Sequence, residues 1–163
     1  MKLSKKLEKL MNEQISHELH AAYLYLGISV AMGAKAFHGT ETWMYAQWKE
    51  EIEHSMRFLN YLGERGAAVE LLPVEGVSTQ YGSPAEAFKA ALEHEKKITQ
   101  KIHDMYDLAV SEKDYESQQM LDWFIKEQIE EEKQTQYFVD RLALAGKDNT
   151  AILLIDKEAG ERK

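Results

Sequence analysis

Apolar residues recur at alternating spacings of three and four along four long segments of the chain, the pattern of a helix that buries one face. We call this repeating row of positions the seam of each segment. The four seams are, in order, Leu7, Met11, Gln14, Glu18, Ala21, Tyr25, Ile28 and Met32; Met44, Gln47, Glu51, His54, Phe58 and Tyr61; Phe88, Ala91, Glu95, Ile98, Ile102, Met105 and Ala109; and Leu121, Phe124, Gln128, Glu131, Thr135, Phe138 and Leu142. The pattern predicts four long helices that face a common core.

Residues that start and stop helices set the bounds of these four helices and of a short fifth one. The five predicted helices span about 4–34, 40–66, 84–112, 115–145 and 150–159. The expected N-caps are Ser4, Thr40, Ser83 and either Asn149 or Thr150. Gly66 and Gly146 are expected to end the second and fourth helices.

Residues 67–83, which we call the linker, carry a proline, two glycines and no helical period. A chain of this length reaches roughly 56 Å when extended, and each long helix is roughly 40–47 Å long. The fold class is therefore all-α, with two antiparallel helical hairpins joined by one long crossover between the second and third helices. Leu71, Leu72, Val74 and Val77 favour a linker that packs against the bundle, and a disordered linker is the alternative.

Composition and charge limit the classes of function. The 163 residues fit one domain, and 44% apolar with 29% charged residues is ordinary for a soluble protein. Cysteine is absent, which excludes disulfides, thiolate-bound zinc and iron–sulfur clusters. The net charge of −8 argues against nucleic acid as a partner. Because no segment predicts a membrane span or a signal peptide, we expect a cytoplasmic protein with no membrane partner.

A glutamate interrupts each of the four seams, and a histidine also interrupts the second. Glu18 lies 19 residues before the middle of the first predicted turn, and His54 lies 17 residues after it. Glu95 and Glu131 each lie 18 residues from the middle of the turn between the third and fourth helices. Antiparallel helices bring such positions to the same height. Together with Glu51, these residues are predicted to form one polar layer in the middle of the bundle.

That layer is costly unless it binds cations. An ionised carboxylate in a low-dielectric core costs several kcal/mol, and four of them also repel one another. No Lys or Arg occupies the seams, so either several carboxyls keep protons with raised pKa values or cations bind among them. Glu51-x-x-His54 places oxygen and nitrogen ligands on one helical face. An oxygen-rich set with one imidazole suits iron or manganese better than zinc.

Two neutral side chains on the seams are further candidates. Tyr25 lies two turns from Glu18 and is either a core aromatic residue or a hydrogen-bond donor to a metal ligand. Gln128 faces inward one turn before Glu131, where its amide can bond an oxygen species or a weakly held second ion. The acidic run 130–132 is mainly a solvated face, except that Glu131 belongs to the seam.

Taken in order along the chain, these motifs resemble the non-haem ferritins of bacteria and archaea. The matching residues are Glu18, Tyr25, Glu50-Glu51-x-x-His54, Glu95 and Glu127-Gln128-x-x-Glu131. The resemblance covers nearly the whole chain, including the LAGK turn at 144–147 and LLIDKEA in the last helix. It implies a ferritin-like four-helix bundle, which has the long crossover described above.

The resemblance also implies three neighbouring iron positions. The implied ligands are Glu18, Glu51 and His54 for the first ion; Glu95 and Glu131, with Glu51 as bridge and Gln128 and Tyr25 nearby, for the second; and Glu50, Glu127 and Glu130, sharing Glu131, for a third. Bacterioferritins, by contrast, repeat Glu-x-x-His on the fourth helix and bind haem through a Met between the second-helix ligands. This chain has Glu127-x-x-Glu130 and the pair Ile52 and Glu53 at those places, so no haem is expected.

The function implied by the resemblance is iron storage by a ferroxidase. Such a protein oxidises Fe²⁺ with dioxygen or hydrogen peroxide and deposits ferric mineral inside a homo-oligomeric shell of 24 subunits, for iron homeostasis and protection from oxidative stress. Two alternatives remain. One is a di-iron or di-manganese oxidase or peroxide scavenger that never mineralises, and the other is a structural bundle whose buried acids form a protonated network.

Overall fold

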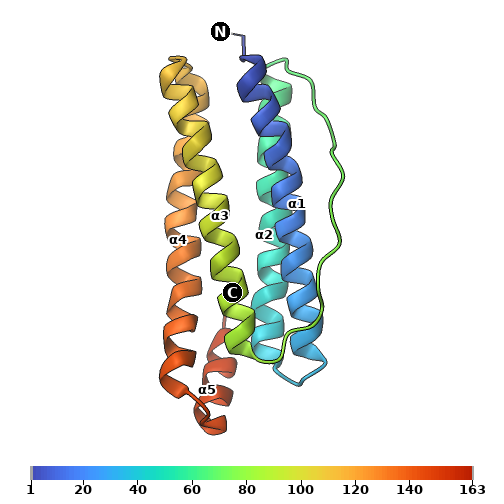
Figure 1. The fold of residues 1–163 in the computed structure, drawn as a ribbon, viewed down its shortest axis with the longest axis vertical. Coiled ribbons are helices and arrows are strands. Elements are labelled where there is room, and N and C mark those ends of the chain that lie inside the picture. Colours follow the sequence, from blue (N-terminus) through green and yellow to red (C-terminus); the bar gives the residue numbers. More distant parts are fainter. Residues whose placement is uncertain (1, 163) are drawn as a thin grey trace.

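The computed structural model describes residues 2–162, and this part of the chain contains five α-helices and no strand. The helices are α1 (Lys5–Gly33), α2 (His38–Glu64), α3 (Pro84–Ser111), α4 (Tyr115–Ala145) and α5 (Asn149–Ala159). Every bound lies within two residues of the expected one. Figure 1 shows the α1–α2 and α3–α4 hairpins side by side, with the linker running the length of the bundle beside α1. The all-α prediction with a crossover between the second and third helices is confirmed.

Two of the four predicted N-caps, Ser4 and Ser83, are confirmed, whereas those of α2 and α5 differ. The hydroxyl oxygens of Ser4 and Ser83 accept hydrogen bonds from backbone N–H groups three residues on. Thr40 was predicted to cap α2, but the helix begins earlier, after Phe37, and Thr40 lies inside its first turn. Its N–H and hydroxyl both donate to Asp156 Oδ1 of α5 at 2.7 Å. The free N–H groups of α2 are thus satisfied by a side chain from a distant part of the chain.

The cap of α5 also differs from the prediction. Asp148, rather than Asn149 or Thr150, is the N-cap, and its carboxylate accepts from the N–H of Thr150 at 2.9 Å. A carboxylate at this position accepts the free N–H groups and also interacts favourably with the positive end of the helix dipole.

The linker is held by hydrogen bonds more than by apolar packing. The side-chain amide of Asn12 on α1 donates to one linker carbonyl at 2.9 Å and accepts from a linker N–H at 2.7 Å. Leu71 and Leu72 are 72% and 37% exposed, so the prediction that they pack against the bundle was wrong. Val74 and Val77 are partly buried.

The buried apolar residues form two clusters, one on each side of a polar layer. One cluster includes Ile15, Phe58, Ile98 and Phe124, and the other includes Tyr25, Met44, Ala91 and Phe138. On each long helix, the seam glutamate lies between a member of one cluster and a member of the other. The polar layer is therefore enclosed by apolar core at both ends.

Candidate metal centre

The seven inner candidate residues are all buried. Their exposed fractions lie between 0% and 5%, and the residues are Glu18 and Tyr25 of α1, Glu51 and His54 of α2, Glu95 of α3, and Gln128 and Glu131 of α4. All four long helices contribute, as the spacing of the seams predicts. The layer thus has a high density of titratable groups in a low-dielectric setting.

Two groups of three side chains are arranged so that each could hold one cation. Ligand atoms of Glu18, Glu51 and His54 lie within 4.8 Å of one another, and so do those of His54, Glu127 and Glu131. His54 belongs to both groups, so the two positions are neighbours. The donor sets are oxygen-rich with one imidazole, which suits iron or manganese.

Glu95 belongs to neither group of three, and its carboxylate accepts hydrogen bonds from two neighbouring side chains. One oxygen accepts from the hydroxyl of Tyr25, and the other accepts from Gln128 Nε2 at 3.0 Å. Gln128 also lies 3.3 Å from the hydroxyl of Thr99. Tyr25 and Gln128 therefore orient Glu95.

Two buried glutamines orient two of the other acids, and the sequence pattern did not single these glutamines out. Gln14 Nε2 donates to Glu18 at 2.8 Å, and Gln47 Nε2 donates to Glu131 at 2.6 Å. Gln14 lies one turn before Glu18 on the same seam. A seam amide one turn from a seam acid is the signal that could have identified it. Gln47 bonds an acid of a different helix, which no spacing along one helix predicts.

Two carboxylate oxygens in the layer have no partner. Glu18 Oε2 and Glu51 Oε1 are buried without a hydrogen bond, and both residues belong to the first group of three. A buried polar atom without a partner costs free energy, so such atoms normally meet a proton, a water molecule or an ion. A divalent cation between these two oxygens and His54 fits the donor set.

Burial and crowding make the layer hold protons when no cation is present. Desolvation, reinforced by the charges of the other acids, raises the pKa of Glu18 and of Glu51 well above the usual range for glutamate. Burial also raises the pKa of Glu95, and burial with the neighbouring Glu95 raises the pKa of Glu131 to about 8. Cation binding at neutral pH therefore releases protons from the layer.

Two residues implied for a third ion lie apart from these groups. Glu130 is exposed, and its carboxylate accepts from Gln134 at 2.9 Å. Glu50 is partly exposed and pairs with Arg162, whose Nη2 lies 2.5 Å from Glu50 Oε2. Of Glu50, Glu127 and Glu130, only Glu127 belongs to one of the two groups of three.

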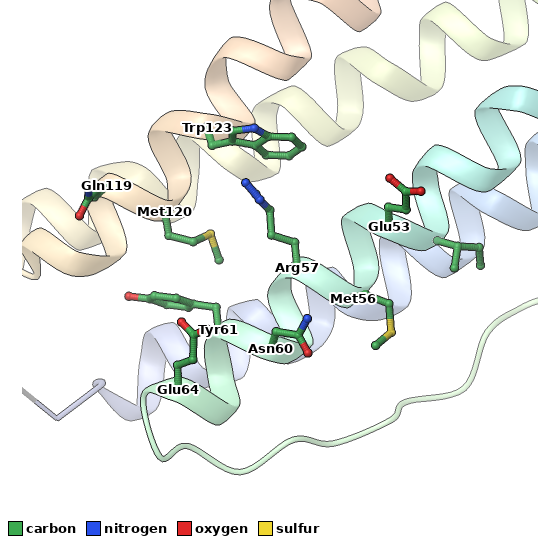
Figure 2. A pocket seen from close by; sticks show the side chains of 10 residues that line it. Glu53, Met56, Arg57, Asn60, Tyr61, Glu64, Gln119, Met120 and Trp123 are labelled. Atoms are coloured by element: carbon green, nitrogen blue, oxygen red, sulfur yellow. The ribbon is translucent and has the colours of Figure 1, made fainter. Parts of the chain in front are cut away.

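A surface pocket of about 530 Å³ lies between α2 and α4 and is lined in part by Arg57 and Trp123. Figure 2 shows Arg57 reaching toward Trp123 in this pocket, and the guanidinium carbon lies 3.8 Å from the ring centroid. On its inner side the ring of Trp123 meets those of Phe124 and His54 edge-on, with centroids 4.9 and 5.6 Å apart. Trp123 thus separates His54 from the pocket.

Comparisons with known proteins agree with this architecture. The family model for the ferritin-like domain matches residues 8–145. The bacterial non-heme ferritins of Bacteroides fragilis strain 638R and Staphylococcus aureus strain USA300 are 35% and 32% identical over 160 residues, which is 98% of this chain and 99% and 96% of theirs.

Solved structures show the same fold. An open-pore ferritin from the archaeon Archaeoglobus fulgidus is 37% identical and superposes with a TM-score of 0.96 over 99% of both chains. The expected ferritin-like bundle is thereby confirmed. With a family match over most of its length, relatives above 30% identity and the same four-helix architecture, this chain belongs to the ferritin-like family.

Proposed function

We propose that this protein is an iron-storage ferritin with a ferroxidase centre in the polar layer of each subunit. The observation that carries the proposal is the group of Glu18, Glu51 and His54, in which two buried carboxylate oxygens face the layer without a partner. The relatives named non-heme ferritin support iron as the metal.

The residues divide into ligands and residues that orient them. Glu18, Glu51 and His54 bind the first Fe²⁺ ion, and Glu51 bridges to a second ion. Glu95 and Glu131 bind that second ion, so Glu95 exchanges a hydrogen bond for a metal bond. Before the ions bind, Tyr25 and Gln128 hold Glu95 in place, and both side chains remain beside the ions afterwards.

The charge of the site favours oxidation. Anionic oxygen ligands stabilise Fe³⁺ relative to Fe²⁺. Two Fe²⁺ ions give one electron each to dioxygen, which takes up two protons and leaves as hydrogen peroxide. With peroxide as oxidant, the same two electrons and two further protons yield two water molecules. The protons displaced from the carboxyls when the ions bind are one source for this step.

A third ion beside the first two completes the proposed centre. Glu127 lies with His54 and Glu131, and Glu50 and Glu130 are the remaining proposed ligands. Both must turn from their present partners to bind it.

Storage requires assembly, because one bundle has no room for mineral. We propose a homo-oligomeric shell of 24 cytoplasmic subunits that protects the cell from reactive iron. Leu153 and Leu154 of α5 are 57% and 63% exposed, and Leu144 before it is 87% exposed. Contacts between subunits would cover these side chains. Within residues 2–162, no helix is long and apolar enough to cross a membrane.

Anaerobic titration of the metal-free protein with Fe²⁺, followed by aerobic loading, tests the proposal. We expect two to three ions per chain, fast oxidation, and electron-dense cores inside hollow particles. Binding of fewer than two ions would favour a structural role for the acids. Oxidation by a stable monomer or dimer that forms no core would favour the oxidase or scavenger instead.

A further inference from the structure

The chain carries its own cation at the edge of the polar layer. Arg162 follows α5, and its Nη2 lies 2.5 Å from Oε2 of Glu50, 112 positions earlier in the chain. Its guanidinium carbon lies 4.5 Å from the ring centroid of Trp43. Only 13% of the Arg162 side chain is exposed. A desolvated guanidinium therefore lies against a carboxylate implied in iron binding.

The charge of Arg162 also reaches the layer itself. Burial is the main cause that raises the pKa of Glu131, and the positive charge of Arg162 acts against that rise. Glu131 is one of the three side chains grouped with His54 and Glu127. Arg162 thus pairs directly with the outer acid Glu50, while only its charge acts on the inner acid Glu131.

The helix that precedes Arg162, α5, is held firmly against the start of α2. Asp156 accepts from the N–H groups of Gly39 and Thr40 at 3.1 and 2.7 Å. The helices approach so closely that a Cβ on Gly39 would lie 1.6 Å from the carbonyl oxygen of Asp156. Only the last few residues, after the C-cap Gly160, need to move for Arg162 to leave.

The docked arginine is incompletely bonded. Its Nη1 atom is buried and has no hydrogen-bond partner. An unsatisfied buried donor weakens the docked state relative to a solvated one. Arg162 can therefore give up its position to a better cation.

We propose that Arg162 competes with a third Fe²⁺ ion for Glu50, so that the C-terminal segment controls how tightly that ion is held. The proposal rests on the proposed function. A divalent ion bound by Glu50 and a neighbouring carboxylate gains more than a single guanidinium does, but it is repelled while the guanidinium remains. The third ion accordingly binds as Arg162 withdraws from Glu50 and Trp43.

Calorimetric titration of the metal-free protein with Fe²⁺ under anaerobic conditions tests this. In Arg162→Gln we expect the third ion to bind roughly tenfold more tightly, because a nearby positive charge is removed, while the first two ions bind as before. Arg162→Lys keeps the charge and should bind the third ion as the wild type does. Equal or weaker binding of the third ion in Arg162→Gln would overturn the proposal.

A matched control separates local competition from a general charge effect. Arg141 pairs with Glu158 of α5 at 3.0 Å and does not contact Glu50, so Arg141→Gln should leave all three affinities unchanged. An equal increase in the affinity for the third ion in both variants would contradict a local role for Arg162. If the wild type binds no tight pair of ions, the proposed function itself fails, which is a different result.

Hydrogen exchange of the wild type gives an independent readout that needs no variant. The N–H of Gly160 is bonded to carbonyls of α5, and we expect exchange at residues 160–162 to rise only after two ions per chain have bound. Unchanged protection through the third equivalent would contradict the withdrawal of Arg162.

Discussion

A buried acid at the end of the bundle has an oppositely charged side chain as its partner, whereas the buried acids in the middle of the bundle do not. Where α2 ends and α4 begins, Arg65 donates to both carboxylate oxygens of Asp114 at 2.9 Å each. Asp114 in turn accepts from the N–H of Ser117 at 3.1 Å and caps α4. In the middle layer, no Lys or Arg within residues 2–162 forms an ion pair with the four seam glutamates.

The protonation behaviour of the two regions differs accordingly. Burial alone would raise the pKa of Asp114, but the hydrogen bonds from Arg65 and from the N–H of Ser117 outweigh it and the pKa is lowered. Burial raises the pKa of Glu18 and Glu51, and no internal cation opposes it sufficiently. A buried charge with a fixed internal partner supports the fold, whereas buried acids without such a partner must bind protons or cations from solution.

Removing the internal cation should have the largest effect on stability. In Arg65→Ala, Asp114 is left buried and unpaired, and the free energy of unfolding of the metal-free protein should fall by about 3 kcal/mol. Chemical denaturation measures this. Arg141→Ala is the control, because the Arg141–Glu158 pair is partly exposed and its loss should cost less than about 1 kcal/mol. Equal losses in both variants would remove the contrast between buried and exposed pairs.

Removing a ligand from the layer should affect chemistry rather than folding. In Glu51→Ala the proposed bridge is lost, and the initial rate of Fe²⁺ oxidation should fall at least about 100-fold. Stopped-flow absorbance after mixing with aerated Fe²⁺ measures the rate. Glu53→Ala is the matched control, since Glu53 is exposed on the same helix and should oxidise iron normally. A near-normal rate for Glu51→Ala would contradict its assignment.

The fold was predictable because its main signals are local or periodic. The seams determined which faces are buried, and Ser4 and Ser83 cap helices as their local sequence indicates. The error at Thr40 arose because its partner, Asp156, belongs to a helix 116 residues away. The prediction that Leu71 and Leu72 pack against the bundle was wrong because composition does not show which side of an extended segment faces the bundle.

The site was predictable only as far as the seams extend. An acid is easy to recognise on an apolar seam, and each seam carries one: Glu18, Glu51, Glu95 and Glu131. The lengths of the antiparallel helices bring these four residues to one height. Arg162 follows the last helix with no periodic signal, and its contact with the site depends on how α5 folds back. Pairing across a bundle is set by tertiary packing, which spacing along one helix cannot reveal.

The pH dependence of stability should differ in sign between the two regions. A seam glutamate binds its proton more tightly in the folded chain, so stability falls as pH rises from the ordinary glutamate pKa to the raised one, which is about 8 for Glu131. We expect the metal-free protein to lose roughly 3 kcal/mol between pH 5 and pH 8.

Denaturation at several pH values with a chelator present measures this slope. Glu131→Gln should make the slope shallower, because the amide does not titrate, while the other seam glutamates keep the sign of the slope. The lowered pKa of Asp114 acts in the opposite direction, and its contribution is lost only as the solution becomes more acidic than pH 4. A metal-free protein that gains stability from pH 5 to pH 8 would show that the layer is ionised and compensated from within.

The smallest expected effect gives the sharpest test of the contrast with Arg65. Glu95→Gln keeps the shape of the side chain and an oxygen that can accept from Tyr25 or Gln128. It also removes one potential charge from a crowded layer, so the metal-free protein should be equally stable or about 1 kcal/mol more stable. Denaturation of the metal-free variant measures this, and iron titration of the same sample should show a weakened second ion. A loss of stability as large as that of Arg65→Ala would mean that Glu95 serves the fold, and the distinction between the two regions would disappear.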